Sequence, residues 1–253
     1  MPKFFIKTEN LKENEEIWIT GSDVNHIKNV LRKKIDDKIN ICNSDTQKNY
    51  ECVIKNIEEN KIVCKILDEV KSLAESNLNI TIFQGLPKSD KMELIIQKAT
   101  ELGVKTIVPV ITKRTVIKLK DKDKDKQNKV DRWRKIAEVA AKQSGRDIIP
   151  IIENIINIAD IKFDEFDKIF VLYENEEKIS IKDEIEQLKN DNKEELNIGI
   201  VIGPEGGFAE SEIEQLRLNQ NVSVVTLGKR ILRTETVALV VSGILMYELG
   251  DLN

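Results

Sequence analysis

The sequence predicts an α/β protein built on a parallel sheet, preceded by a small β-barrel. Residues 1–70 consist mostly of short strand-like runs, whereas from residue 78 apolar strands alternate with helices, the pattern of a parallel sheet covered on both faces. A length of 253 residues with 40% apolar content is enough to bury a core in each part. The polar stretch Lys71–Asn77 separates them, which predicts domains 1–73 and 74–253.

The first part is predicted to contain five strands and one helix. Short runs rich in β-branched residues predict strands at Phe4–Ile6, Glu16–Thr20, Lys38–Cys42, Glu51–Ile57 and Lys61–Leu67. Ser22 or Asp23 suits the N-cap of a helix running through His26 to Arg32, because a short polar side chain there accepts a hydrogen bond from a free backbone N–H. Glu58-Glu59-Asn60 is a predicted turn between the last two strands.

The second part is predicted to alternate strands and helices. Its strands are expected at Asn79–Gln84, Thr106–Val110, Lys168–Leu172, Asn197–Ile202 and Val222–Leu227. Its helices are expected at Asp90–Leu102, Val130–Gln143, Ile181–Lys189, Glu210–Asn219 and Thr236–Leu249. Gly103 follows the first of these helices, where the left-handed backbone of a helix end favours glycine.

The cysteine and histidine content excludes several kinds of chemistry. Cys42, Cys52 and Cys64 are odd in number and widely spaced, which suits neither a disulfide framework nor a zinc site, so we expect them in the core of a protein from a reducing compartment. The one histidine, His26, argues against zinc hydrolysis and against a Ser-His-Asp triad, and it is assigned to packing. We therefore expect no metal, and a reaction carried by carboxylates, arginines, lysines or an organic cofactor.

The chain carries no signal for a membrane or for export. Met1–Ile6 lacks the apolar run and cleavage site of a signal peptide, and no stretch reaches about 18 consecutive apolar residues. We expect a cytoplasmic protein with no membrane partner.

The net charge of −4 conceals a strong asymmetry along the chain. Residues 84–146 carry 17 basic and 8 acidic side chains, whereas residues 147–253 carry 10 and 22. A basic middle third in an acidic protein favours a phosphate-binding surface, most simply for a nucleic acid. Part of that charge lies in the alternating Lys/Asp run 118–126, which is predicted to be a solvated loop.

Two glycine turns are the sharpest chemical signal. Ile202–Phe208 follows an apolar strand and contains three glycines, and Leu227–Thr236 follows another strand and precedes a helix of small apolar residues. Glycine permits positive φ and close approach of a ligand, and the helix that follows offers free N–H donors. Neither turn has the spacing of a dinucleotide or phosphate loop. Turns at the ends of two strands predict a binding crevice at one edge of the sheet.

Blocks in the same order along nearly the whole chain resemble the ribosomal RNA small subunit methyltransferase E family, of the SPOUT class. They are His26, Val30–Arg32, Lys88–Met92, Lys98–Val104, Gln143–Arg146, Ile202–Phe208 and Leu227–Thr236. The resemblance implies a PUA-like N-terminal barrel, a C-terminal domain with a trefoil knot, and a homodimer. It also implies S-adenosylmethionine-dependent methylation of N3 of one uridine in 16S rRNA, and we expect the RNA to be methylated in the assembled small subunit. Lys229 stands where the family pattern has Pro, and Val237 where it has Ala.

The resemblance also implies which residues hold the methyl donor. The cofactor-binding candidates are Leu172, Glu174, Ile202, Gly203, Pro204, Glu205, Gly206, Gly207, Leu227, Gly228, Ile231, Leu232 and Thr236. Most contribute backbone atoms, whereas Glu174 and Glu205 are expected near the ribose or the sulfonium.

Methylation of an imide requires that its N3 proton be lost. Arg233 is the first candidate for this chemistry, because a guanidinium near a uracil carbonyl lowers the imide pKa. Glu205 and Glu235 are the candidate proton acceptors. The alternative interpretation of Arg233 and Glu235 is solvation and capping at a helix start.

The predicted RNA contacts are basic residues outside the Lys/Asp run: Arg32, Lys88, Lys91, Lys113, Arg114 and Arg146. Two other functions stay open on the sequence alone. A non-catalytic RNA- or ribosome-binding factor of the same architecture needs no paired glycine turns, and a metabolic α/β enzyme that uses a nucleotide predicts no affinity for RNA.

Overall fold

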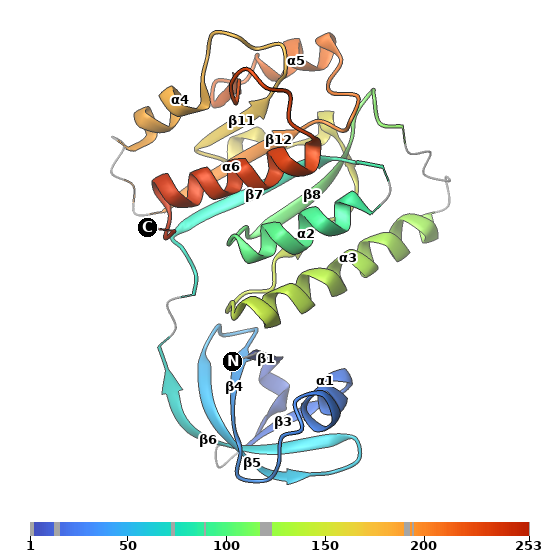
Figure 1. Ribbon diagram of the computed structural model, residues 1–253, viewed down its shortest axis with the longest axis vertical. Helices are drawn as coiled ribbons and strands as arrows, with labels where there is room; N and C mark the ends of the chain where they lie inside the picture. The colour runs from blue at the N-terminus through green and yellow to red at the C-terminus, as the bar shows by residue number, and fades with distance from the viewer. Residues whose placement is uncertain are drawn as a thin grey trace. The chain divides into compact units, whose positions relative to one another are not determined.

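The computed structural model of the chain describes residues 3–12, 16–71, 74–88, 90–116, 123–189, 193 and 195–252. The chain divides into two compact units (Figure 1). The first comprises Met1–Glu75 and Ala141–Ile149, and the second comprises Ser76–Ala140 and Pro150–Asn253. Residues 72 and 73, where the sequence predicts the boundary, lie outside the described residues.

The first unit is a six-stranded, curled sheet. Its strands are β1 (Lys3–Ile6), β2 (Leu11–Lys12), β3 (Glu16–Thr20), β4 (Lys38–Asn43), β5 (Asn49–Ile57) and β6 (Lys61–Val70). They follow the order β1-β4-β5-β6-β3-β2. The sheet curls, with β1 and β2 at the two ends of this order, so the predicted small β-barrel is present as a curled half-barrel. Its concave core holds Phe4, Ile17, Ile41 and Ile54.

The helix of the first unit differs in detail from the prediction. It comprises α1 (Ser22–Asn25) and a π-helical turn, His26–Val30, and it begins after Gly21 without a side-chain cap. Asp23 does not cap the helix, and its carboxylate instead accepts hydrogen bonds from the Lys142 ammonium at 2.8 and 3.0 Å. The packing predicted for His26 is confirmed, since its ring meets Phe4 edge to face at 5.9 Å. Cys42, Cys52 and Cys64 are buried free thiols, as expected.

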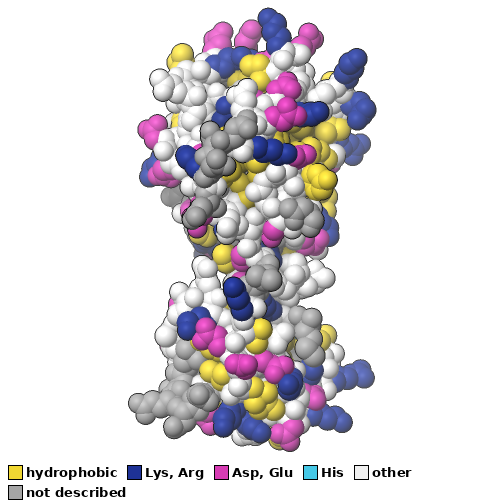
Figure 2. All heavy atoms as spheres, turned by 90° about the vertical axis from the view of Figure 1, so that its left-hand side faces the viewer, with side chains coloured by type: hydrophobic (Ala, Val, Ile, Leu, Met, Phe, Trp, Pro, Cys, Tyr) yellow, Lys and Arg dark blue, Asp and Glu magenta, His cyan; other side chains and the backbone are white. Residues whose placement is uncertain are grey.

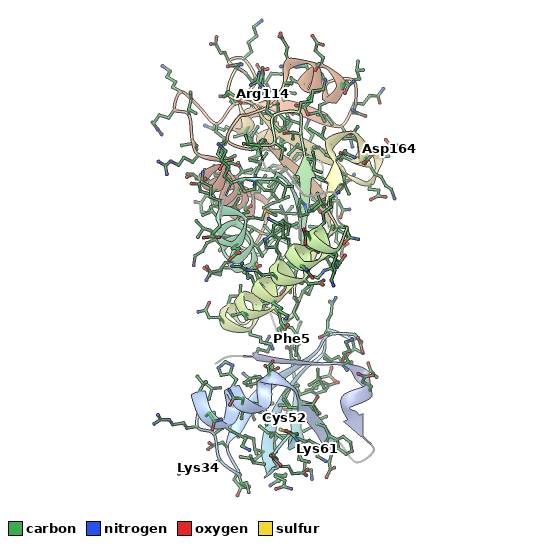
Figure 3. All side chains as sticks on the ribbon, turned by 90° about the vertical axis from the view of Figure 1, so that its right-hand side faces the viewer. Phe5, Lys34, Cys52, Lys61, Arg114 and Asp164 are labelled. Carbon is green, nitrogen blue, oxygen red and sulfur yellow. The ribbon has the colours of Figure 1, made fainter. Side chains whose placement is uncertain are left out.

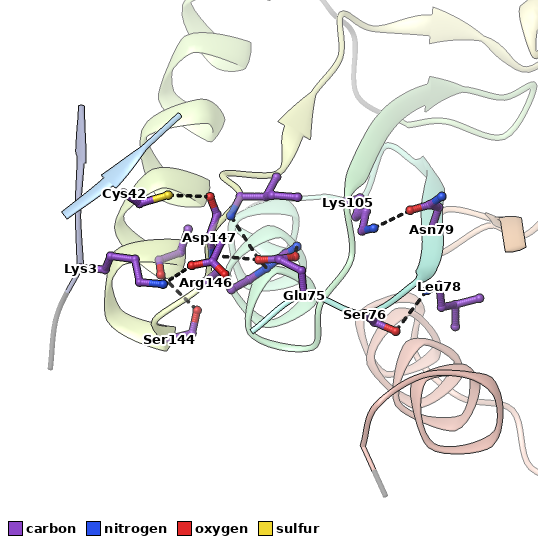
Figure 4. Close-up of polar contacts among 12 residues, drawn as sticks. Lys3, Cys42, Glu75, Ser76, Leu78, Asn79, Lys105, Ser144, Arg146 and Asp147 are labelled. Atoms are coloured by element: carbon purple, nitrogen blue, oxygen red, sulfur yellow. Dashed lines mark hydrogen bonds and ion pairs between the residues drawn. The ribbon is translucent and has the colours of Figure 1, made fainter. Parts of the chain in front are cut away.

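Residues 141–149 join the first unit through buried charges, drawn in Figure 4. Glu75 accepts hydrogen bonds from the backbone N–H of Asp147 and Ile148 at 2.9 and 3.1 Å, and from the Arg146 guanidinium at 3.1 and 2.6 Å. Asp147 also forms an ion pair with Lys3. These contacts attach a segment that is distant in the sequence to the half-barrel.

The second unit contains a sheet in which every strand pair is parallel. Its strands are β7 (Leu78–Gly85), β8 (Thr106–Ile111), β9 (Ile151–Ile152), β10 (Ile156–Asn157), β11 (Lys168–Leu172), β12 (Leu196–Ile202) and β13 (Val222–Val225). The order is β10-β8-β7-β12-β11-β13, with β9 also beside β8. The predicted strands are confirmed to within two residues at each end, and β9 and β10 are additional.

Five helices accompany this sheet in the described part of the chain. They are α2 (Lys91–Glu101), α3 (Asp123–Ser144), α4 (Ile181–Leu188), α5 (Glu210–Leu216) and α6 (Thr234–Leu249). Helices α2 and α6 contact each other, and α6 also contacts β7 and β12 (Figure 1). The alternation of side chains along β7 buries Ile80 and Ile82 on one face of the sheet and Phe83 on the other.

Helix α3 corrects the prediction of a loop for the Lys/Asp run. Residues 117–122 lie outside the described residues, but residues 123–126 are already helical, ahead of the predicted start at Val130. Side-chain bonds within the helix support this polar start, as between Gln127 and Asp131 at 2.8 Å. Farther along, Val130, Trp133 and Ala137 recur at helical spacing and are buried.

Candidate functional site

The ends of three adjacent strands bring the two glycine turns together. In the sheet, Leu172 at the end of β11 pairs with Ile202 of β12 on one side and with Val225 of β13 on the other. The turn Gly203–Gly207 leaves β12, and the loop Thr226–Arg233 leaves β13. The carboxyl ends of parallel strands are where open α/β sheets bind ligands.

Both turns line one cavity of about 510 Å³, which is large enough for an organic ligand of drug size. Its walls are Lys91, Leu172–Glu174, Ile202–Gly207, Val225–Thr234 and Val237. The crevice predicted between the two turns is therefore present in the structure.

Backbone geometry explains why glycine is required at two of these positions. Gly207 has a φ of +65°, and a Cβ placed there would lie 2.2 Å from Oε1 of Glu174. Gly228 has a φ of +104°, and its N–H donates to the Thr226 hydroxyl at 3.2 Å. Residues other than glycine rarely adopt such backbone conformations. Because glycine has no Cβ, the peptide groups at these two positions are open to a ligand.

A buried relay fixes the start of α6 to the turn after β12. The side-chain amide of Gln84 donates to the Thr234 hydroxyl at 2.8 Å, and that hydroxyl donates to the carbonyl oxygen of Gly203 at 2.7 Å. Gln84 is completely buried and Thr234 nearly so. Because these groups have no access to water, the relay holds two walls of the cavity in one arrangement.

A cluster of one lysine and two glutamates stands at the cavity wall. The Lys91 ammonium lies 3.0 Å from Oε1 of Glu205 and 3.2 Å from Oε2 of Glu235. The Lys88 N–H donates to both Glu205 oxygens at 3.0 and 3.2 Å. Burial acts to raise the pKa of Glu205, but hydrogen bonds from its own N–H, from Lys91 and from Lys88 outweigh it and hold that pKa below its usual value.

The candidate catalytic residues lie around this cluster. Arg233 is exposed, lines the cavity and occupies the N-cap position of α6 without a side-chain cap bond. Glu205 also lines the cavity, whereas Glu235 lies behind it with its side chain 14% exposed. An arginine facing the cavity and two acids joined by a lysine are thus within one site.

The cofactor candidates all line the cavity except Thr236. Helix α6 starts at Thr234, two residues before the predicted start, and Thr234 points to Gly203. Successive helical residues are rotated by about 100° around the axis, so Thr236 is directed elsewhere. The structure therefore does not support the assignment of Thr236 to the donor site.

The predicted RNA contacts are divided between the two units. Arg32 belongs to the first unit, where it is exposed with a φ of 54°. Arg114, labelled in Figure 3, donates to the Gly206 carbonyl oxygen at 3.0 Å, and the Lys113 ammonium donates to the Ser211 hydroxyl at 2.7 Å. Lys88, whose N–H donates to Glu205, is exposed. On the face drawn in Figure 2, basic side chains stand among acidic ones.

Two of the predicted RNA contacts have other roles in the structure. Arg146 is only 3% exposed and binds Glu75, so it offers no surface to an RNA, and its prediction as a contact is wrong for this conformation. The reason is that a planar guanidinium suits a buried bidentate carboxylate as well as a phosphate. Lys91 lies in the cavity wall with Glu205, and its ammonium also pairs with Glu235.

Several cavity residues were not among the cofactor candidates or the catalytic candidates. They are Tyr173, Val225, Thr226, Lys229, Arg230, Thr234 and Val237. Tyr173 follows directly on β11, and Val225 and Thr226 stand at the end of β13, so the rule that strand ends form the crevice would have included these three. Lys91 is distant in the sequence from both turns, and only the fold reveals its contact with them.

The described residues include no group of three His, Cys, Asp or Glu side chains arranged to hold a metal ion. Among the same residues, no helix has both the length and the apolar character needed to span a bilayer.

Comparison with known proteins places this geometry among RNA-modifying enzymes. Residues 74–246 match the model of an RNA methyltransferase domain, and residues 19–67 match that of an RNA methyltransferase PUA domain. The chain is 34% identical to ribosomal RNA small subunit methyltransferase E of Bacillus subtilis, over 98% of this chain and 97% of that protein. It is 32% identical to the protein of the same name from Mesomycoplasma hyopneumoniae, over 94% and 96%.

Two similar solved structures contain a bound cofactor. One is a ribosomal RNA small subunit methyltransferase E from Neisseria gonorrhoeae bound to S-adenosyl methionine, with a TM-score of 0.83, 30% identity and full coverage of both chains. The other is a putative methyltransferase from Legionella pneumophila in complex with the same cofactor, with a TM-score of 0.82, 27% identity and coverage of 99% and 98%.

Proposed function

The chain belongs to the ribosomal RNA small subunit methyltransferase E family, and from this premise we propose that it methylates N3 of one uridine in 16S rRNA. It is an S-adenosylmethionine-dependent rRNA methyltransferase. The observation that carries the proposal is the single cavity that both glycine turns line, in a chain similar to two proteins solved with that cofactor.

The residues of the cavity fit the methyl donor. Backbone groups of the turns after β12 and β13 are accessible beside glycines, and they suit an adenosyl group that needs close hydrogen bonding. Glu174 and Glu205 offer negative charge to a sulfonium, or carboxylate oxygens that accept hydrogen bonds from ribose hydroxyls. When bound, the cofactor supplies an electrophilic methyl group.

The protein's own contribution is to align the uracil and remove its proton. N3 must lose a proton for its electron pair to form the new C–N bond, and a guanidinium beside a carbonyl oxygen stabilises the resulting anion. Arg233 is exposed at the cavity wall and is our candidate for this role. Glu205 and Glu235 remain the candidate proton acceptors, and both are joined to Lys91.

The proposal includes a trefoil knot at the C-terminus. Strand β13 lies at the far side of β11, whereas α6, which follows it, contacts β7 and β12. The intervening loop must therefore return across the strand ends, and the contact of Thr226 with Ser180 lies on that path. Tracing this loop through a crystal structure tests the knot, which an unthreaded loop would contradict.

A homodimer in the cytoplasm, acting on the assembled small subunit, completes the proposal. Helix α6 is apolar around its circumference, and Val240 and Tyr247 on it are 38% and 63% exposed. A helix of that kind favours a partner surface. Sedimentation of the purified protein tests the dimer, and the rate of methylation of intact subunits against free 16S rRNA tests the substrate form. The proposed domains remain 1–73 and 74–253.

Mass spectrometry of 16S rRNA from cells with and without the gene tests the reaction. We expect N3-methyluridine at one position to disappear without the gene and to return with the wild-type gene. Unchanged rRNA would contradict the proposal. A non-catalytic RNA-binding factor is the alternative in another class, and purified protein that binds rRNA without transferring methyl groups would favour it.

A further inference from the structure

Lys91 contacts two segments of the site that the backbone does not connect directly. It is the first residue of α2, while Glu205 lies on the turn after β12 and Glu235 lies in the first turn of α6. Its ammonium is 3.0 Å from Glu205 and 3.2 Å from Glu235. One side chain therefore joins the donor turn to the helix start that carries Arg233.

The position is unfavourable for a lysine considered alone. The N-terminus of a helix carries partial positive charge, so a cation there is disfavoured. The two carboxylates offset this, and the hydrogen bonds that the Lys91 ammonium donates to Glu205 and to Glu235 raise the pKa of Lys91 above its usual value. The side chains of Lys91, Glu205 and Glu235 are 28%, 26% and 14% exposed, so solvent screens the contacts only in part.

The two glutamates differ in what else they contact. Glu205 accepts the Lys88 N–H at both oxygens in addition to Lys91, so its carboxylate is held by groups of the protein. Oε2 of Glu235 is buried, and Lys91 is its ion-pair partner. Removing Lys91 would leave Glu235, whose Oε2 is buried, without this ion-pair partner, which is costly where water is excluded.

We propose that Lys91 is a positioning residue of methyl transfer, which sets the distance between the donor turn and Arg233 by holding Glu205 and Glu235 together. This rests on the proposed function of the same site. It replaces the prediction that Lys91 contacts RNA phosphate, because the ammonium already faces two carboxylates. Lys91 acts through the glutamates and does not itself touch the reacting atoms.

The test is steady-state kinetics of Lys91→Met with S-adenosylmethionine and 16S rRNA. A displacement of reacting groups by about 1 Å lowers rates by up to about 100-fold, so we expect kcat to fall between about 10- and 100-fold. We expect KM for RNA to change by less than about threefold, because no phosphate contact is lost. Lys91→Arg, which keeps the charge and both contacts within reach, should restore most of the rate.

Two further variants separate positioning from general damage to α2. Lys98→Met is the matched control, because Lys98 lies on the same helix, pairs with Glu101 at 2.8 Å and is outside the cavity. It should leave kcat and the melting temperature unchanged. In a double-mutant cycle, the variant that combines Glu235→Gln with Lys91→Met should be no slower than the slower single variant, because both substitutions remove the same contact between Lys91 and Glu235.

Three results would overturn the proposal while the wild type is active. One is an unchanged kcat in Lys91→Met, another is a raised KM for RNA with kcat retained, and the third is an equal loss in Lys98→Met. A wild type that transfers no methyl group to rRNA would instead refute the proposed function, so the two failures are distinguishable. Circular dichroism of each variant shows that it is folded.

Discussion

Arg233 combines a backbone role with a charge that faces the cavity. Its φ of −69° and ψ of 150° end the loop after β13 and allow α6 to begin at Thr234. Its side chain forms no cap bond, and the residue is exposed and lines the cavity, so the guanidinium is available to a substrate. The backbone role needs no particular side chain, and substitution therefore tests the charge alone.

Replacement of Arg233 by Ala should abolish most activity while leaving the donor bound. Loss of one preorganised donor to a developing anion costs about 100- to 1,000-fold in kcat, whereas we expect the dissociation constant of S-adenosylmethionine to change by less than about threefold. Methyl transfer to 16S rRNA and calorimetry with the donor measure the two quantities. Arg132→Ala, which removes an exposed arginine paired with Glu93, is the control. Equal losses of rate and donor binding would exclude the chemical role of Arg233.

Individual site residues were predictable where the signal is local. Glycine at 207 and 228 follows from turns at strand ends, and the structure gives both positive φ. Thr236, which the family resemblance suggested, does not line the cavity, and because α6 starts at Thr234 it is Thr234 that lines it. The contacts of Lys91 depend on segments more than 100 residues apart, which no local pattern encodes.

The segment from Tyr173 to Ser180 is the element that connects β11 to α4 and lines the cavity at its start. The buried carboxylate of Glu176 stabilises this segment through hydrogen bonds and an ion pair. The carboxylate is 8% exposed and accepts the N–H of Lys178 at 2.9 Å and of Ile179 at 3.3 Å, together with the Arg217 guanidinium at 2.5 Å. Burial raises the pKa of Glu176, but these three contacts outweigh it and hold the pKa below its usual value.

Glu176→Gln should therefore destabilise the protein most at neutral pH. A group with a lowered folded-state pKa stabilises the fold above its unfolded pKa, and this contribution is lost as the pH falls through the folded value. We expect the free energy of unfolding to fall by about 1–3 kcal/mol at pH 7, and the difference from wild type to shrink in acid below about pH 4. Urea unfolding at both pH values measures this, and a difference that grows in acid would contradict it.

Elements were predictable where they are long and periodic. The five strands predicted for the parallel sheet carry apolar runs, and the structure contains all five. Strands β2, β9 and β10 have two residues each, which is too few to show a period. How far the sheet of the first unit curls depends on strand twist, which the sequence pattern does not reveal. The early start of α3 falls in the alternating Lys/Asp run, whose charged residues resemble a solvated loop in the sequence.

At the scale of the whole molecule, residues 141–149 return to the first unit after the chain has entered the second. Glu75 and Arg146 form the centre of this attachment, with side chains 16% and 4% exposed. A buried ion pair contributes little net free energy of folding compared with an apolar pair, but removing one partner leaves the other charge buried and unpaired. The attachment is therefore sensitive to substitution on either side.

Arg146→Met should lower the free energy of unfolding by about 3–5 kcal/mol, because Glu75 would keep a buried charge without its partner. Lys38→Met is the control in the same unit, since Lys38 and Glu51 are 58% and 36% exposed and such a pair is worth about 1 kcal/mol at most. Urea unfolding measures both. If Arg146→Met were as stable as wild type and weakened RNA binding, the original assignment as an RNA contact would be restored.

The account as a whole depends on one cavity for the methyl donor between the turns after β12 and β13. Calorimetric titration of the wild type and of Gly207→Ala with S-adenosylmethionine tests it most directly. Alanine at φ +65° strains the turn and brings its Cβ against Glu174, so we predict saturable binding by the wild type and at least about tenfold weaker binding by the variant, a loss of roughly 1.4 kcal/mol. Absence of wild-type binding at millimolar donor, or equal affinity of both proteins, would contradict it.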